Sequence, residues 1–144
     1  MKILSSIFIL GFVLSSCHQK NANQLFFDQA DISKSTLNSV IEAKVIKPLK
    51  DKAHQTGICQ KHVCYASIEI IQIIQNGQNY HGQFVKGDTI EAFFNFTLGN
   101  TQKLFPHLNK TLPGLKRDDI FLAELFEKQS SESMYNIQLY AIKN

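Results

Sequence analysis

The sequence predicts an all-β domain, with room for at most one short helix. Eleven phenylalanines and no tryptophan occur among the 144 residues, and isoleucine is frequent, a composition typical of a core built from strands. Several segments alternate apolar and polar residues with the two-residue period of a strand. Two turn signals, Asn76-Gly77 and Lys86-Gly87-Asp88, follow one such segment and precede the next.

The first predicted strand covers residues 40–47. A helix over residues 35–49 is the alternative, because apolar residues also recur there every four positions and Pro48 would end such a helix. We prefer the strand, since the stretch is rich in β-branched residues, which favour extended backbone. Three residues would then share its inward face: Ile41, Ala43 and Val45.

The second and third predicted strands cover residues 65–75 and 89–98. In the second, the apolar phase changes by one residue between Ile70 and Ile71, which predicts a β-bulge. The third has the most regular alternation, with an apolar face and a mostly polar one. Its predicted inward residues are Ile90, Ala92, Phe94, Phe96 and Leu98, and its outward residues are Glu91, Phe93, Asn95 and Thr97.

An irregular insert and two further strands complete the predicted domain. Two prolines allow only a short helix or turn in the insert, at residues 102–105. The fourth strand covers residues 119–127 and the fifth residues 135–142. The expected face of the fifth strand consists of Tyr135, Ile137, Leu139 and Ala141.

The beginning of the chain predicts a bacterial lipoprotein. Lys2 precedes an apolar run, residues 3–14, that is shorter than the ~20 residues of a membrane-spanning helix and fits a cleaved secretory signal. Leu14-Ser15-Ser16-Cys17 resembles a lipobox, so cleavage would leave a diacylated Cys17 as the first residue. An ordinary signal peptide with an incidental cysteine is the alternative.

The residues after Cys17 predict where the lipoprotein resides. His18 rather than an aspartate follows Cys17, which by resemblance to bacterial sorting rules favours an outer-membrane lipid anchor. No acidic residue precedes Asp28, so we expect the periplasmic side, with exposure at the cell surface as the alternative. The predicted organisation is a signal peptide, a lipidated tether and one β domain, at residues 1–16, 17–38 and 39–144.

The order of the predicted elements is that of an OB-fold, a five-stranded Greek-key barrel. Within that class the chain resembles the netrin-like barrels, which include the tissue inhibitors of metalloproteinases. The inhibitory cysteine of those proteins begins the first strand, whereas Cys17 lies far upstream and is predicted to carry lipid. Enzyme inhibition is therefore only a weaker alternative function. The resembling stretches are residues 40–45, 66–70, 84–90 and 112–115.

Two cysteines remain once Cys17 is assigned to lipid. After export, Cys59 and Cys64 would lie in an oxidising compartment, where a disulfide between them is the expected state. The alternatives are a thiol-redox pair, or a zinc or copper site in which His62 and either His54 or His81 join the two thiolates. Apart from the covalent lipid, the disulfide interpretation requires no cofactor.

We expect a non-enzymatic binding module of the cell envelope. The chain has no glycine-rich phosphate loop and neither the metalloprotease nor the serine-hydrolase motif. Its net charge of +3 is too small to indicate nucleic acid. In an OB-fold, residues 48–64 and 128–133 would flank the ligand face. The tentative contacts with an envelope protein or cell-wall component are His54, His62, Phe93 and Tyr140.

Overall fold

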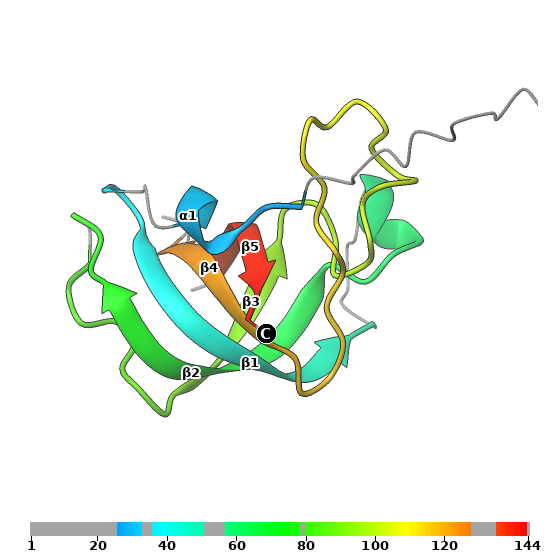
Figure 1. The fold of residues 1–144 in the computed structure, drawn as a ribbon. Helices are drawn as coiled ribbons and strands as arrows, with labels where there is room; N and C mark the ends of the chain where they lie inside the picture. The colour runs from blue at the N-terminus through cyan, green and yellow to red at the C-terminus, as the bar shows by residue number, and fades with distance from the viewer. Residues whose placement is uncertain (1–25, 33–35, 51–56, 79, 128–134, 144) are drawn as a thin grey trace, which may run out of the picture.

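The domain is a closed five-stranded β-barrel (Figure 1). The computed structural model describes residues 26–32, 36–50, 57–78, 80–127 and 135–143. The strands follow one another around the barrel in the order β1-β2-β3-β5-β4, and the β3–β5 pair is parallel whereas the others are antiparallel. The prediction of an OB-fold-like Greek-key barrel is confirmed. The strands are β1 (Ser39–Leu49), β2 (Tyr65–Gln75), β3 (Thr89–Phe94), β4 (Ile120–Glu127) and β5 (Tyr135–Ile142). A short helix α1 (Gln29–Ile32) precedes β1, and a 3-10 turn η1 (Gly57–Gln60) lies between β1 and β2.

The structure confirms that the first segment is a strand rather than a helix. β1 pairs with β2 on one edge and with β4 on the other, so both of its edges contribute backbone hydrogen bonds to the barrel. The side chains of Ile41, Ala43 and Val45 are fully buried in the interior. The predicted bulge in β2 is also present: Ala43 pairs with Ile70 and Glu42 with Gln72, which leaves Ile71 as the extra residue.

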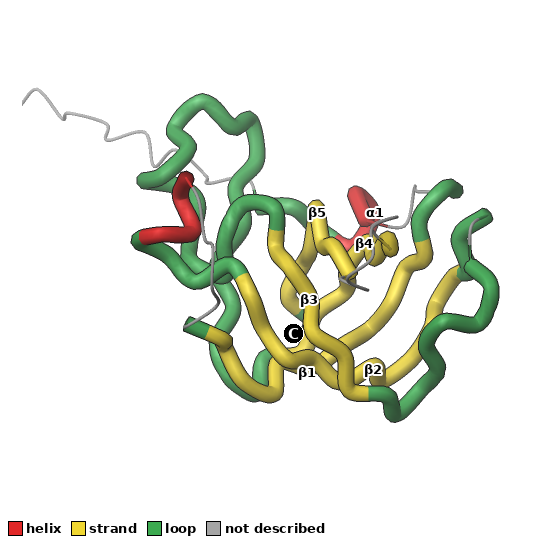
Figure 2. The backbone as a smooth tube through the Cα atoms, turned by 180° about the vertical axis from the view of Figure 1, so that it is seen from behind, coloured by secondary structure: helices red, strands yellow, loops and turns green. Residues whose placement is uncertain are grey.

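Figure 2 shows the backbone of the barrel from behind. Aromatic rings from three of its strands pack together in the interior. Phe94 lies with its ring centre 6.0 Å from that of Phe121 and 5.9 Å from that of Tyr140. Each of the three side chains is no more than 1 % exposed. Such edge-to-face and tilted contacts add to the free energy gained by burying the rings.

β3 ends earlier than predicted, at Phe94. The backbone N–H of Phe94 donates to the carbonyl of Cys64, and the N–H of Leu98 donates to that of Val63. Between these two bonds the chain bends, and the Thr97 hydroxyl donates to the same Val63 carbonyl at 2.9 Å. Thr97 is therefore fully buried, and its predicted outward position is wrong. A hydroxyl that finds a backbone acceptor can be buried at low cost.

The predicted face of β5 is also wrong beyond Ile137. Ala123 pairs with Tyr140 whereas Leu125 pairs with Ile137, so β5 contains one extra residue at this point. The bulge reverses the alternation, and Tyr140 points into the core while Leu139 and Ala141 join the outer cluster described next. The Tyr140 hydroxyl accepts a hydrogen bond from the N–H of Gly114. Burial raises the pKa of this hydroxyl.

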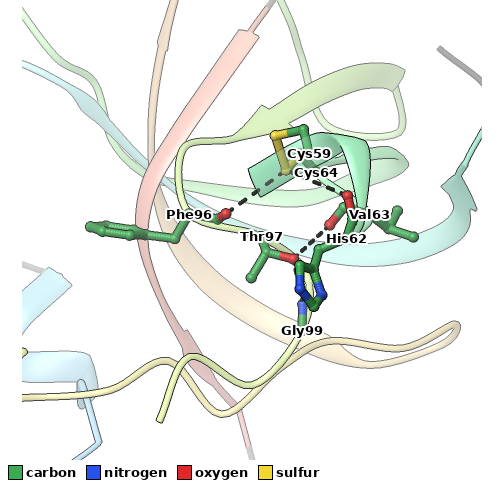
Figure 3. The surroundings of a disulfide bond; sticks show 7 residues. All are labelled: Cys59, His62, Val63, Cys64, Phe96, Thr97 and Gly99. Atoms are coloured by element: carbon green, nitrogen blue, oxygen red, sulfur yellow. Dashed lines mark hydrogen bonds between the residues drawn. A yellow bond between two sulfur atoms is a disulfide. The ribbon is translucent and has the colours of Figure 1, made fainter. Parts of the chain in front are cut away.

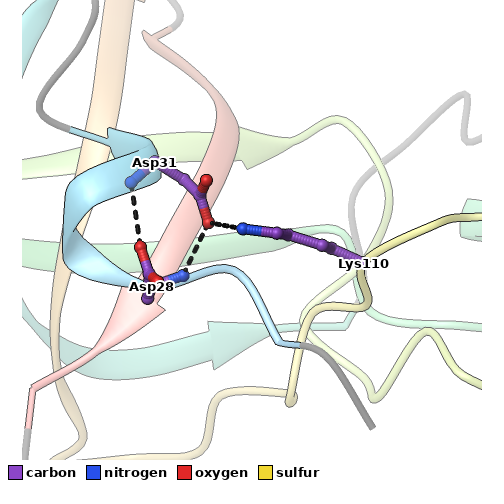
Figure 4. A network of polar contacts seen from close by, with 3 residues as sticks. All are labelled: Asp28, Asp31 and Lys110. Atoms are coloured by element: carbon purple, nitrogen blue, oxygen red, sulfur yellow. Dashed lines mark hydrogen bonds and ion pairs between the residues drawn. The ribbon is translucent and has the colours of Figure 1, made fainter.

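Part of the predicted tether packs on the barrel. Residues 26–32 run from a backbone bridge between Phe26 and Thr111 to α1, which covers the outer face of β4 and β5. Asp28 and Asp31 accept hydrogen bonds from each other's backbone N–H, a reciprocal cap of the helix (Figure 4). Ile32 is fully buried, and the outer cluster comprises Ile32, Val40, Ala141, Leu122 and Leu139.

The insert between β3 and β4 is held by backbone and threonine contacts. A short helix or a turn was predicted at residues 102–105, and the structure has a turn there. In this turn the backbone N–H groups of Leu104 and Phe105 donate to the carbonyl of Thr101. The buried Thr101 hydroxyl accepts the N–H of Leu112 at 2.7 Å. Gly114 has a φ of +91°, and a Cβ there would lie 2.9 Å from the backbone nitrogen of Asn100. Only glycine fits this approach.

Glu124 gives the domain a predictable dependence on pH. Burial raises the pKa of its carboxyl, and a hydrogen bond from Asn38 partly opposes this. Because the folded state binds the proton more tightly, the free energy of unfolding declines as pH rises through the unfolded value of 4.5 towards the folded one. We expect Glu124→Gln to flatten this decline and to stabilise the domain at neutral pH by less than ~1 kcal/mol, since water screens the partly exposed group.

Urea unfolding of both proteins across the acidic range checks this prediction. Glu69→Gln is the control. The carboxylate of Glu69, on β2, is partly exposed and forms an ion pair with Lys44 at 3.5 Å, whereas no ion pair is described for Glu124. Parallel pH profiles for the original protein and Glu124→Gln would contradict the assignment of the effect to Glu124.

Candidate functional site

The two cysteines form a disulfide at one end of the barrel (Figure 3). Cys59 belongs to η1 and Cys64 directly precedes β2, and both side chains are buried. The Cys64 sulfur lies 3.8 Å from the carbonyl oxygens of His62 and Phe96; these are close contacts, since a disulfide sulfur carries no proton to donate. The disulfide therefore ties η1 to the start of β2, next to the bend that ends β3.

The disulfide leaves no thiolate for the metal site considered above. His62 is half-buried in the loop that the disulfide closes, and His81 is exposed between β2 and β3. Within the described residues, no group of three or more histidine, cysteine, aspartate or glutamate side chains could hold a metal ion. His54 lies outside the described residues.

An apolar row crosses the outer surface of the barrel beside the disulfide loop. The backbone register places Leu49 opposite Tyr65, Tyr65 opposite Phe93, and Asn136 between Phe93 and Phe126. Residues opposite each other in a sheet point to the same face. The row faces outward, because the next residues along β2, β3 and β4 are buried in the core. We call Leu49, Tyr65, Phe93 and Phe126 the apolar row.

The four side chains of the apolar row are half-buried rather than fully exposed to solvent. The rings of Tyr65 and Phe93 lie 5.0 Å apart at 45°, so they form a ridge rather than a flat platform. Asn136, only 8 % exposed, is the polar residue between the phenylalanines.

The outer surface becomes polar with distance from the disulfide. The next positions in register are Lys47, Ser67 and Glu91, and beyond them Lys44 pairs with Glu69. The apolar row is therefore confined to one end of the sheet. Its position next to the disulfide loop is where ligands bind in OB-folds.

The structure brings some of the predicted site residues together and separates others. Phe93 and His62 lie at the disulfide end of the barrel, as expected, and Phe93 is a cross-strand partner of Tyr65. Tyr140 does not belong to the surface, because the bulge in β5 turns its ring into the core. Cys17 and the loop of residues 128–133 lie outside the described residues.

Sequence reasoning missed three members of the apolar row. Tyr65 and Phe126 occupy an outward phase of their own strands, so the alternation contained their signal. Leu49 has the same phase as the inward Ile41 and Val45, and it faces outward only because the register of β1 shifts between Val45 and Lys47. What the alternation did not contain is the register between strands, which aligns the three residues with Phe93.

Comparisons with protein-family models, with curated proteins and with solved structures found no match to this chain. None of the helices in the described part of the chain has the length and apolar character to cross a membrane.

Proposed function

We propose that this protein is a lipid-anchored module of the bacterial envelope that binds another envelope protein and catalyses no reaction. The lipobox at Cys17 supports the anchor. The apolar row carries the binding part of the proposal: four apolar side chains from four strands gather on one outer surface, beside a loop closed by a disulfide.

The chemistry of the apolar row favours a protein partner. Protein interfaces concentrate their binding free energy in a few aromatic residues surrounded by polar ones, and the row has this arrangement, with Ser67 and Glu91 alongside it. Asn136 could supply a hydrogen bond at the centre of such an interface. The disulfide and the bend after Phe94 fix the adjacent backbone, which lowers the ordering cost of binding.

Cross-linking in intact cells tests the binding proposal. The full-length tagged protein and two variants, Phe93→Ala and Phe126→Ala, would be cross-linked in the envelope, and recovered partners measured by quantitative mass spectrometry. Since truncating a central interface residue costs ~2 kcal/mol or more, we expect at least ~10-fold less partner with either variant. Ile74→Ala is the matched control, because Ile74 is 49 % exposed on β2 outside the apolar row.

Two results would contradict the proposal. One is a partner recovered equally with the row variants and with Ile74→Ala. The other is recovery of the protein with purified cell wall instead of with a protein, which would make a glycan the ligand. Thermal unfolding of each variant would establish that it is folded.

A further inference from the structure

We propose that the tip of the insert, residues 100–111, is the membrane-facing surface of the barrel and rests against phospholipid headgroups. The proposal assigns an orientation to the anchored domain. It rests on the lipid anchor of the proposed function.

The described chain enters the barrel at the insert. Phe26 forms a backbone bridge with Thr111, and the Phe27 N–H donates to the Thr111 carbonyl at 3.3 Å. The Lys110 ammonium lies 2.6 Å from a carboxylate oxygen of Asp31, which joins the insert to α1 (Figure 4). This hydrogen bond with Asp31 raises the pKa of Lys110. Two sets of contacts therefore hold this segment on the insert: the backbone contacts of Phe26 and Phe27 before α1, and the ion pair of Asp31 within α1.

Covalent geometry keeps this entry point near the anchor. Cys17 precedes Phe26 by nine residues, which span at most ~32 Å even when fully extended. β1 alone, with eleven residues, spans about 36 Å. The tie is thus no longer than a single strand of the barrel, and among the described residues it attaches at the insert.

The chemistry of the insert suits a phospholipid surface. From residue 100 to residue 117 the sequence contains no acidic residue. Lys103 and His107 are exposed at the tip, while Lys110 is engaged by Asp31. Phe26 is 39 % exposed beside the tip. A lysine is favourable near phosphate headgroups, and a phenylalanine ring is favourable where it can bury apolar surface at the boundary between headgroups and acyl chains.

The opposite end of the barrel is the rival contact surface. Leu37 and Ile74 are 60 % and 49 % exposed there, near the place where the Gln78 N–H bonds to the carbonyl of Thr36. An experiment that compares the two ends therefore decides the orientation. Gln102 and Gln78 are both exposed and mark the insert tip and the opposite end.

The test uses Gln102→Cys and Gln78→Cys in the full-length lipidated protein. Each new thiol would carry a fluorescent label, since Cys59 and Cys64 are closed in a disulfide. The protein would be reconstituted in phosphatidylethanolamine–phosphatidylglycerol vesicles that contain a lipid with a nitroxide on its headgroup. We expect the label at position 102 to be quenched severalfold more strongly than the label at position 78.

Equal quenching at the two positions, or stronger quenching at position 78, would overturn the orientation. Mass spectrometry of the purified protein separates this outcome from failure of the anchor. A protein with acyl chains and equal quenching refutes only the orientation, whereas a protein without acyl chains refutes the anchor and the orientation together. Unfolding curves that match the original protein would establish that both labelled variants are folded.

Discussion

Replacing Cys17 by serine is expected to remove all attached acyl mass and to leave the signal peptide uncleaved by the lipoprotein pathway. A serine hydroxyl cannot form the thioether of a lipoprotein, so no acyl chain is attached. Each buried acyl CH₂ contributes about 0.8 kcal/mol, and stable attachment needs at least two lipid chains or equivalent signals. The loss of acyl mass should therefore be complete, and any remaining membrane association of this variant would come from the uncleaved apolar residues 3–14.

Membrane fractionation and intact-mass measurement check this prediction. The matched control replaces Cys59 and Cys64 together by serine, which removes the disulfide but should leave the protein in the membrane fraction with an unchanged acyl mass. A Cys17→Ser protein that still carries acyl mass, or a wild-type protein without acyl mass, would exclude the lipobox interpretation.

Phe94→Ala should cost about 3–5 kcal/mol of unfolding free energy, the usual range for removing a buried phenylalanine. Phe94 is 1 % exposed and contacts the rings of Phe121 and Tyr140. The cavity would lie between three strands whose backbones are fixed by barrel closure, so the site can collapse very little. Because small domains are stable by only ~5–15 kcal/mol, this variant should be partly unfolded at modest urea concentrations.

The neighbouring residue supplies the control for Phe94. Phe93→Ala changes the same side chain on the same strand, but on the half-buried outer face, and we expect a loss of only about 1 kcal/mol, the scale of a cross-strand pair. Equilibrium urea unfolding compares the two variants. A similar loss for both would mean that the inward and outward faces of β3 are wrongly assigned.

The sequence predicted the strands because their signals are local, and the barrel order followed from the resemblance of the element order to an OB-fold. The two-residue alternation marks β2 and β5 with their correct ends, and the change of phase at Ile71 marks the bulge. The disulfide followed from the number of cysteines and the expected compartment. Each of these features depends on neighbouring residues or on a count, which a single chain displays directly.

The errors arose where contacts between distant segments overrule the local pattern. Thr97 can be buried because its hydroxyl donates a hydrogen bond to the Val63 carbonyl, and Tyr140 is buried because the register with β4 shifts at the bulge. The packing of residues 26–32 depends on Lys110 and on the outer cluster around Ile32. No periodicity within the strands encodes these pairings.

The candidate site was predicted only in part for the same reason. The loop with Cys59 and Cys64, and the outward position of Phe93, could be placed from the predicted strand order. The apolar row as a unit could not, because its four residues come from four strands and meet only through register.

The strand order also determines when the domain can acquire its core. β5 is the last strand in the chain, yet it lies between β3 and β4 and completes the ring. Ile32 packs against Val40 at the start of β1 and against Ala141 near the end of the chain. Contacts between distant residues form late and slowly. The barrel therefore stays open until β5 is available, and the apolar inward faces of β1 to β3 lack part of their packing partners until then.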